Sequence, residues 1–174
     1  KYDTVGQKVT IQLDQLQDFS ESTIFIIPVL VDIYTAEKNQ AERHMIWMTE
    51  KSQTFTINCK GTPVWAAVDG DRTILCERIE DLTEDDILLQ LKYGDSFDEK
   101  YEALKLSGNN ENPTIKSLIV KFLDDNFWFL RSAAIDAINI DVSTDTEILD
   151  KIVSLAKNDK RSDVRIAAIQ KLNR

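Results

Sequence analysis

The segment TILCERIEDLTEDDILLQL, residues 73–91, decides the fold because the spacing of its apolar residues changes at Leu82. In the residues before Leu82, apolar and polar side chains alternate, as in a strand that is buried on one face. After it, Thr83 and Asp86 have the spacing of a capping box that begins a helix. We therefore expect strands before this segment and helices after it.

Residues 1–80 are expected to form a domain of short strands with polar turns. Asp69-Gly70-Asp71 is a strong hairpin signal, since glycine accepts a positive φ without steric cost. Pro28 cannot donate to a ladder and therefore belongs at a sheet edge or a bulge. The pattern predicts an antiparallel β-sandwich. Its expected strands are residues 9–13, 24–34, 44–49, 53–58, 64–68 and 73–78.

Residues 81–174 are expected to form an entirely helical domain. A weak repeat runs through it: LRSAAI at residues 130–135 matches VRIAAI at residues 164–169, 34 positions later, and residues 100–104 are a looser copy. Small alanines let helices approach closely, and the basic residue can reach a neighbouring acidic loop. This pattern predicts HEAT-like α-α superhelical repeats, truncated at the C-terminus because no polar capping repeat follows. The expected helix starts are Thr83, Ser96, Asn112-Pro113, Asp125-Asn126, Thr144 and Ser162-Asp163.

Composition excludes some classes of partner. The net charge of −9 is spread over the whole chain, which argues against a nucleic-acid backbone as partner. No apolar run reaches the ~18 residues of a membrane span. Lys1 has neither an initiator methionine nor a signal-peptide pattern near it, so we expect it to be internal to a longer chain. The compartment stays open, cytoplasmic or periplasmic and secreted, since a missing N-terminus would decide it.

The sequence offers no catalytic, cofactor-binding or metal-binding residues. His44 is the one histidine, and a zinc enzyme needs several converging ligands, so we interpret it as structural or surface-exposed. The acidic residues 80–86 are expected to complement a helix dipole, with a calcium loop as the less favoured interpretation. Two free, partly buried thiols at Cys59 and Cys76 are favoured over a disulfide bridge between them.

Phe127, Trp128 and Phe129 form the one candidate contact surface. Three consecutive aromatic side chains cannot all face the same side of a helix. At least one of them must therefore meet another repeat, another domain or solvent.

The order of these features resembles the C-terminal, non-catalytic region of aminopeptidase N-type zinc metallopeptidases. The resemblance rests on residues 9–17, on IPVLVDIY at 27–34, on HMIWM at 44–48, and on TPVWAAVD at 62–69 followed by Ile-Leu. It spans nearly the whole chain, but it involves structural residues alone. The zinc motif HExxH, its distal Glu ligand and the Gly-x-Met-Glu-Asn motif of the family are absent here.

The resemblance implies that this chain supports the missing catalytic domain of the same polypeptide and shapes access for peptide substrates. Zinc is then expected in the parent protein, where it activates the water that hydrolyses an N-terminal peptide bond. The alternative hypothesis is a stand-alone protein- or peptide-binding module. An HExxH motif upstream of this region in the parent would distinguish between them.

Overall fold

The computed structural model describes residues 1–37, 40–108, 110–141 and 145–173. Within this part, the chain divides into two compact units, residues 1–81 and residues 82–174. Strands lie in the first unit and helices in the second.

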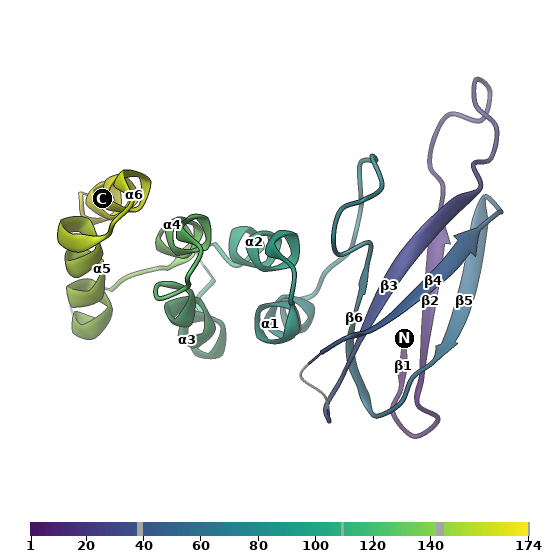
Figure 1. Ribbon diagram of the computed structural model, residues 1–174, viewed down its shortest axis with the longest axis horizontal. Coiled ribbons are helices and arrows are strands. Elements are labelled where there is room, and N and C mark those ends of the chain that lie inside the picture. The colour runs from purple at the N-terminus through teal and green to yellow at the C-terminus, as the bar shows by residue number, and fades with distance from the viewer. Residues whose placement is uncertain (38–39, 109, 142–144, 174) are drawn as a thin grey trace. The chain divides into compact units, whose positions relative to one another are not determined.

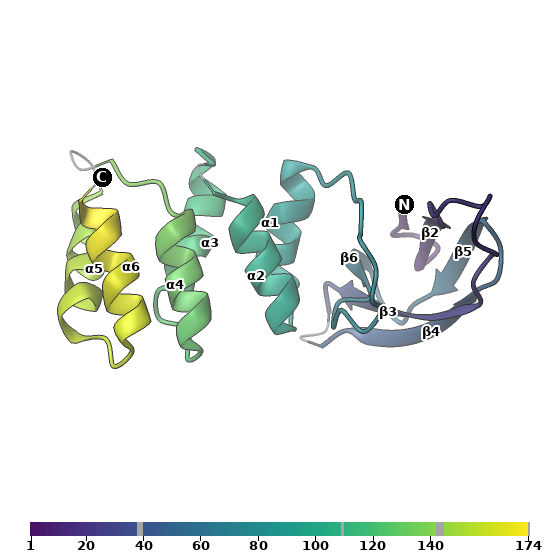
Figure 2. The same ribbon diagram turned by 90° about the horizontal axis from the view of Figure 1, so that it is seen from above.

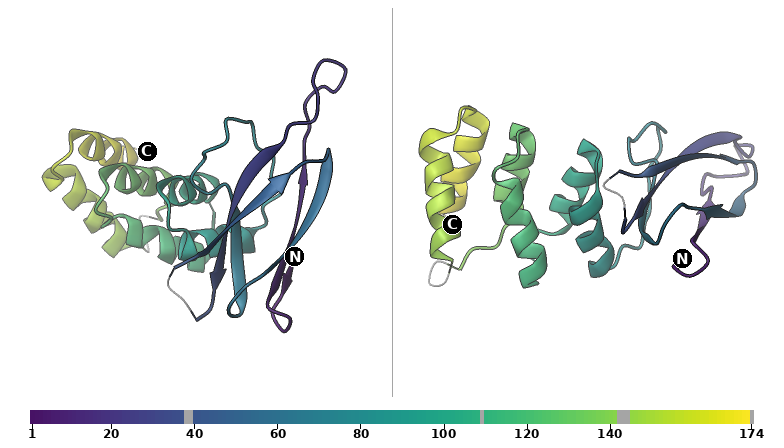
Figure 3. Two further views of the ribbon diagram at one scale, coloured as in Figure 1. Left: turned by 45° about the vertical axis from the view of Figure 1, so that its right-hand side comes forward. Right: turned by 60° about the horizontal axis from the view of Figure 1, so that its bottom comes forward.

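The first unit contains two three-stranded antiparallel sheets, ordered β1-β2-β5 and β4-β3-β6 (Figures 1 and 3). In the first sheet, the register of β2 and β5 runs from Lys8 opposite Asn58 to Asp14 opposite Ser52. Pro28 lies opposite Trp47 of β4, in a part of β3 where pairing with β6 has not yet begun. The strands are β1 (Tyr2–Asp3), β2 (Lys8–Asp14), β3 (Ile27–Thr35), β4 (Glu42–Met48), β5 (Ser52–Asn58) and β6 (Pro63–Val68).

The strand predicted at residues 73–78 is absent, so the predicted hairpin does not form. The chain does turn at Asp69-Gly70-Asp71, where the Arg72 N–H group donates to the Asp69 carbonyl at 2.9 Å. The Asp69 carboxylate accepts hydrogen bonds from the backbone N–H groups of Thr73 and Ile74, at 2.9 and 3.0 Å. Those donors are then not available to a sheet ladder. Leu75 is fully exposed, so it buries nothing that would stabilise a strand. Figure 1 shows this segment after β6 as a loop.

The predicted fold class, an antiparallel β-sandwich followed by HEAT-like superhelical repeats, is therefore wrong. The structure shows two small sheets followed by six helices. One strand is only two residues long, and the predicted last strand does not form, so the sheets have little surface to bury. The buried cluster that they share is correspondingly small. It consists of Val9, Val31, Ile33, Ile57 and Cys59.

In the second unit, each of the first three helices begins directly after a capping residue that the sequence predicts. Thr83 and Ser96 make capping boxes with Asp86 and Glu99, and Asn112 accepts a hydrogen bond from the Thr114 N–H group. The fifth helix begins at Thr146, and its predicted start, Thr144, lies outside the described residues. The helices are α1 (Glu84–Tyr93), α2 (Phe97–Leu106), α3 (Pro113–Phe122), α4 (Trp128–Ala137), α5 (Thr146–Asn158) and α6 (Ser162–Leu172).

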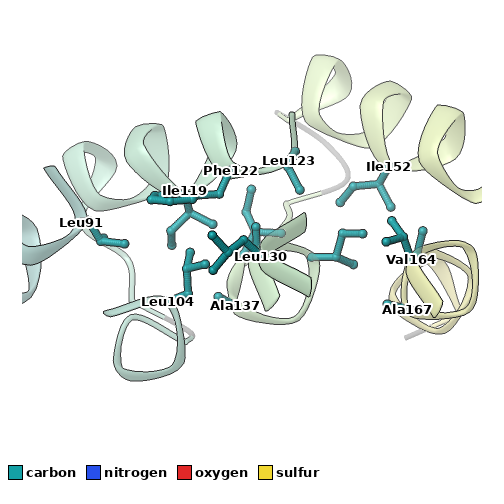
Figure 4. Packing of buried hydrophobic residues seen from close by; sticks show 14 of the residues in the cluster. Leu91, Leu104, Ile119, Phe122, Leu123, Leu130, Ala137, Ile152, Val164 and Ala167 are labelled. Carbon is teal, nitrogen blue, oxygen red and sulfur yellow. The ribbon is translucent and has the colours of Figure 1, made fainter. Parts of the chain in front are cut away.

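The six helices form three successive pairs, α1 with α2, α3 with α4 and α5 with α6 (Figure 2). The second helix of each pair packs against the second helix of the next: α2 contacts α4, and α4 contacts α6. One continuous apolar core runs through all three pairs (Figure 4). It includes Leu91, Leu104, Ile119, Leu130, Ile152 and Val164.

A regular superhelical repeat is not shown by this arrangement. The alanine-rich segment recurs after 34 residues between α4 and α6, but after 31 residues between α2 and α4. The connections between helices also differ in length, so the pairs are not identical units.

Candidate functional site

Phe127, Trp128 and Phe129 lie at the N-terminal end of α4, where Phe127 is the residue that precedes the helix. No side chain caps this helix end. Phe127 is exposed, whereas Trp128 and Phe129 are half-buried. The three rings therefore differ in their surroundings, as consecutive helical positions require.

Five aromatic residues meet here in one aromatic cluster. Phe97 of α2 lies with its ring centre 5.2 Å from that of Phe127 and 5.6 Å from that of Phe129. Tyr101, one helical turn after Phe97, lies 5.2 Å from Phe129 in an edge-to-face arrangement. Trp128 completes the cluster, with its ring centre 5.3 Å from that of Phe129. Such ring pairs each stabilise a fold by ~1 kcal/mol beyond the area that they bury.

The cluster also reaches the third helix pair. The Arg161 guanidinium lies 4.5 Å from the centre of the Trp128 ring, in a cation–π contact. Arg161 precedes α6, so Trp128 faces the third pair while Phe127 and Phe129 face α2 of the first. The exposed rims of Phe97 and Phe127 leave an apolar patch at the surface. The aromatic cluster thus packs between helix pairs, and its exposed part is a surface that an apolar group could contact.

A largely buried ion pair lies beside the aromatic cluster. Arg131 donates from Nε and Nη2 to the two carboxylate oxygens of Asp159, at 2.8 Å each. Its Nη1 donates to the Asp125 carbonyl at 2.8 Å. The prediction that the repeated basic residue reaches a neighbouring acidic loop is confirmed, since Asp159 lies between α5 and α6. The hydrogen bonds from Arg131 hold the pKa of Asp159 below its usual range, and the pKa of Arg131 is raised in return.

His44 lies half-buried in β4, with its Nε2 atom 3.8 Å from a carboxylate oxygen of Glu42. In the part of the chain that the structure describes, no three His, Cys, Asp or Glu residues are grouped so that they could hold a metal ion. Neither Cys59 nor Cys76 forms a disulfide, as the sequence predicts. Cys59 is buried, whereas Cys76 is exposed, so the expected partial burial of Cys76 is wrong. The acidic residues 84–86 occupy the first turn of α1, where Asp86 accepts from the Thr83 N–H group at 2.9 Å.

A second exposed apolar surface lies on the sheet β4-β3-β6. Met45 and Trp47 of β4 are both exposed, and they lie opposite Leu30 and Pro28 of β3. Residues directly opposite one another in antiparallel strands share a face, so these four side chains form one patch, the β4 face. At its end, Arg43 donates to both carboxylate oxygens of the buried Asp32, at 2.7 Å each.

Sequence reasoning missed the contributions of Phe97, Tyr101 and Arg161 to the aromatic cluster. Phe97 and Tyr101 have the i, i+4 spacing of neighbours on one helix face, which was the available signal. Their partners lie some 30 residues away on α4, and local spacing does not specify which helices pack together. The β4 face was missed as well, although Met45 and Trp47 alternate with half-buried residues along one strand.

The fold is similar to a region of a known aminopeptidase. The crystal structure of Legionella pneumophila aminopeptidase A in complex with aspartic acid matches with a TM-score of 0.60 and 14% sequence identity. The match covers 99% of this chain and 25% of that aminopeptidase chain. This chain therefore spans about a quarter of the length of the protein that it resembles. At this identity, the likeness concerns the fold.

No family model and no curated protein sequence matches the chain. Among the described residues, none of the helices has the length and apolar character needed to cross a lipid bilayer.

Proposed function

We propose that this chain is a non-catalytic region of an aminopeptidase-like zinc protein, in which it supports the catalytic domain and shapes the access of peptide substrates. The observation that carries this proposal is the likeness of 99% of the chain to a region that makes up 25% of the Legionella aminopeptidase. Since the chain corresponds to one region of a larger enzyme, we assign the peptide-bond chemistry to residues outside it.

The residues of this chain do not fit a zinc site. A mononuclear zinc site needs three or four converging nitrogen, sulfur or oxygen ligands. His44 is the one histidine, and the Glu42 carboxylate, 3.8 Å from its Nε2 atom, belongs to the same strand. We therefore place the zinc ligands in the catalytic domain of the parent protein.

The β4 face is our candidate for the contact with the catalytic domain. Met45, Trp47, Pro28 and Leu30 place adjoining apolar side chains on one side of a sheet. Contiguous exposed apolar patches on soluble domains commonly mark interaction surfaces, and tryptophan and methionine are enriched at the centres of such interfaces.

The first test is enzymatic. The isolated chain, with added zinc, should not hydrolyse aminoacyl 4-nitroanilides, whereas the complete parent protein should. Replacing a histidine of the parent's HExxH motif should abolish that activity. Turnover by the isolated chain, or a parent sequence without a zinc-binding motif, would contradict the proposal.

The second test concerns the β4 face in the complete protein. Trp47→Ser should weaken the association of this region with the catalytic domain, which can be followed by hydrogen exchange along β4. Leu16→Ser is the matched control, because Leu16 is an exposed apolar residue outside the β4 face. If hydrogen exchange along β4 is equally fast in the two variants, the β4 face is not the contact surface.

A stand-alone peptide-binding module is the second candidate function, and the exposed rims of Phe97 and Phe127 favour it. Titration of the isolated chain with unstructured apolar hexapeptides would then change the fluorescence of Trp128 in a saturable way. Phe127→Ser should abolish that change, whereas Leu106→Ser, an exposed apolar position of α2, should retain it. If no peptide causes a saturable change, this second candidate is wrong.

A further inference from the structure

The side of α4 that faces the third helix pair carries a stripe of three residues. Arg131 and Ile135 are four positions apart and lie on one side of α4, and Ile138, the residue that follows the helix, comes three positions later. Ile135 and Ile138 are 0% exposed. Arg131 forms its ion pair with Asp159, in the loop that joins α5 to α6. This side of α4 is thus covered by a helix pair that presents a carboxylate to the arginine.

The corresponding side of α2 is also buried, although its basic residue, Lys100, has no ion pair like that of Arg131 among the described residues. Leu104 and Ser107 precede Ile135 and Ile138 by 31 residues, and both are 0% exposed. The next pair packs on α2 through α4. The second helices of two successive pairs, α2 and α4, therefore both bury these positions, and each packs against the pair that follows.

The stripe recurs on α6, where it is open. Arg165, Ile169 and Leu172 follow Arg131, Ile135 and Ile138 by 34 residues. Ile169 is 49% exposed and Leu172 is 36% exposed. The two apolar positions that are buried on α4 are therefore exposed to solvent on α6. We call these three residues the α6 stripe.

Arg165 is positioned as Arg131 is. Arg165 donates from Nη1 to the Asp159 carbonyl at 2.7 Å, just as Arg131 donates from Nη1 to the Asp125 carbonyl at 2.8 Å. The two carbonyls are themselves 34 residues apart. Among the described residues, Arg165 has no carboxylate ion pair like that of Arg131 with Asp159. The hydrogen bond to the Asp159 carbonyl holds the Arg165 guanidinium in place, but in the described part of the chain the α6 stripe has no carboxylate that corresponds to the partner of Arg131.

We propose that the α6 stripe binds a further helix pair of the same kind as α5–α6, whose connecting loop presents an aspartate or glutamate to Arg165. The continuity with the α2–α4 and α4–α6 interfaces identifies the occupant as a helix pair, because that is what covers this stripe twice already. The charge of Arg165 identifies the chemistry of the loop. This inference does not depend on the aminopeptidase-like function.

The test uses the chain's own third pair as the probe. A second copy of residues 141–174 is fused directly after Arg174, which keeps the 34-residue spacing. Hydrogen exchange in α6 should become about tenfold slower in the extended chain, since the α6 stripe is then covered. Ile169→Asp should remove this protection. Gln170→Asp is the matched control, because Gln170 is exposed and corresponds to Asp136, which stays exposed on α4.

A charge exchange tests the role of Arg165. In the extended chain, Arg165→Asp should abolish the protection, and Asp159→Arg in the copied pair alone should restore it. The proposal is overturned if the added pair gives no protection, if Gln170→Asp is as disruptive as Ile169→Asp, or if the exchange fails to restore protection. The proposal would also be overturned if the unextended chain forms a dimer and Ile169→Asp prevents that dimerisation. The α6 stripe would then bind a second copy of the chain and not a further helix pair.

Discussion

Arg131 joins two helix pairs through a single side chain, so its loss should be costly. Arg131→Met keeps much of the apolar stem but leaves the buried Asp159 carboxylate without its bidentate partner. Breaking a buried ion pair on one side lowers the free energy of unfolding by about 3 kcal/mol. Lys151→Met is the control, since Lys151 pairs with an exposed Asp124 and such surface pairs contribute about 1 kcal/mol or less. Urea denaturation followed by circular dichroism measures both, and equal losses would contradict the prediction.

The same ion pair predicts sensitivity to acid. Arg131 lowers the pKa of Asp159 in the folded state, whereas an unfolded Asp titrates near ~3.9. The stabilisation is fully present above that value and is lost as the pH falls through the lowered folded pKa. The difference in free energy of unfolding between the unaltered chain and Arg131→Met should therefore shrink below about pH 4. Urea titrations from neutral to acid pH measure it, and a difference independent of pH would refute the assignment.

The contact of Arg131 with an acidic loop could be predicted from sequence, whereas the partners of the aromatic residues could not. The arginine recurs at the same place in two copies of one segment, which marks it as part of a repeated interface. Phe127, Trp128 and Phe129 are correctly expected to meet something beyond their own helix face. That Phe97 meets two of these rings depends on how the helix pairs stack, and only the three-dimensional arrangement reveals it.

At the scale of elements, helix starts with local caps should be sensitive to single substitutions. The Asp86 N–H group donates to the Thr83 hydroxyl at 3.2 Å, and Glu99 and Ser96 make the equivalent bond at 3.1 Å. Thr83→Ala and Ser96→Ala should each lower the free energy of unfolding by about 1 kcal/mol, because a helix N–H group loses its acceptor. Ser162→Ala is the control, since α6 has no side-chain cap. Chemical denaturation of the three variants measures the difference, and a loss with Ser162→Ala as large as the others would refute the role of the caps.

The local character of these caps explains why the sequence predicts the starts of the first three helices correctly. The strand predicted at residues 73–78 is wrong for a different reason. A capping box involves residues three positions apart, so all its partners are visible in the sequence. The predicted strand at residues 73–78 has a suitable local composition, but Asp69 takes the N–H groups of Thr73 and Ile74. Competition of this kind, between a local turn and a distant strand, is decided by tertiary structure, which local propensity does not contain.

At the scale of the whole molecule, the two buried cores do not share residues. The apolar core of the helical unit draws its buried members from Leu91 to Ala168, and the smaller core of the strand unit draws its members from Val9 to Cys59. The boundary between the units follows Asp81. Since hydrophobic burial is the main stabilising contribution to folding, a unit that contains its whole core can fold without the other.

Expression of residues 82–174 alone should therefore give a cooperatively unfolding helical protein. The large core of this unit predicts a far-ultraviolet spectrum typical of helices and a single thermal transition. Residues 1–81 alone should be much less stable, because their buried cluster is small and one of their strands, Tyr2–Asp3, is only two residues long. Calorimetry of the complete chain should accordingly resolve a weaker transition that is absent from the helical fragment. If residues 82–174 are instead unfolded by themselves, the helical unit needs contacts from outside its own core, and the independence of the two units is refuted.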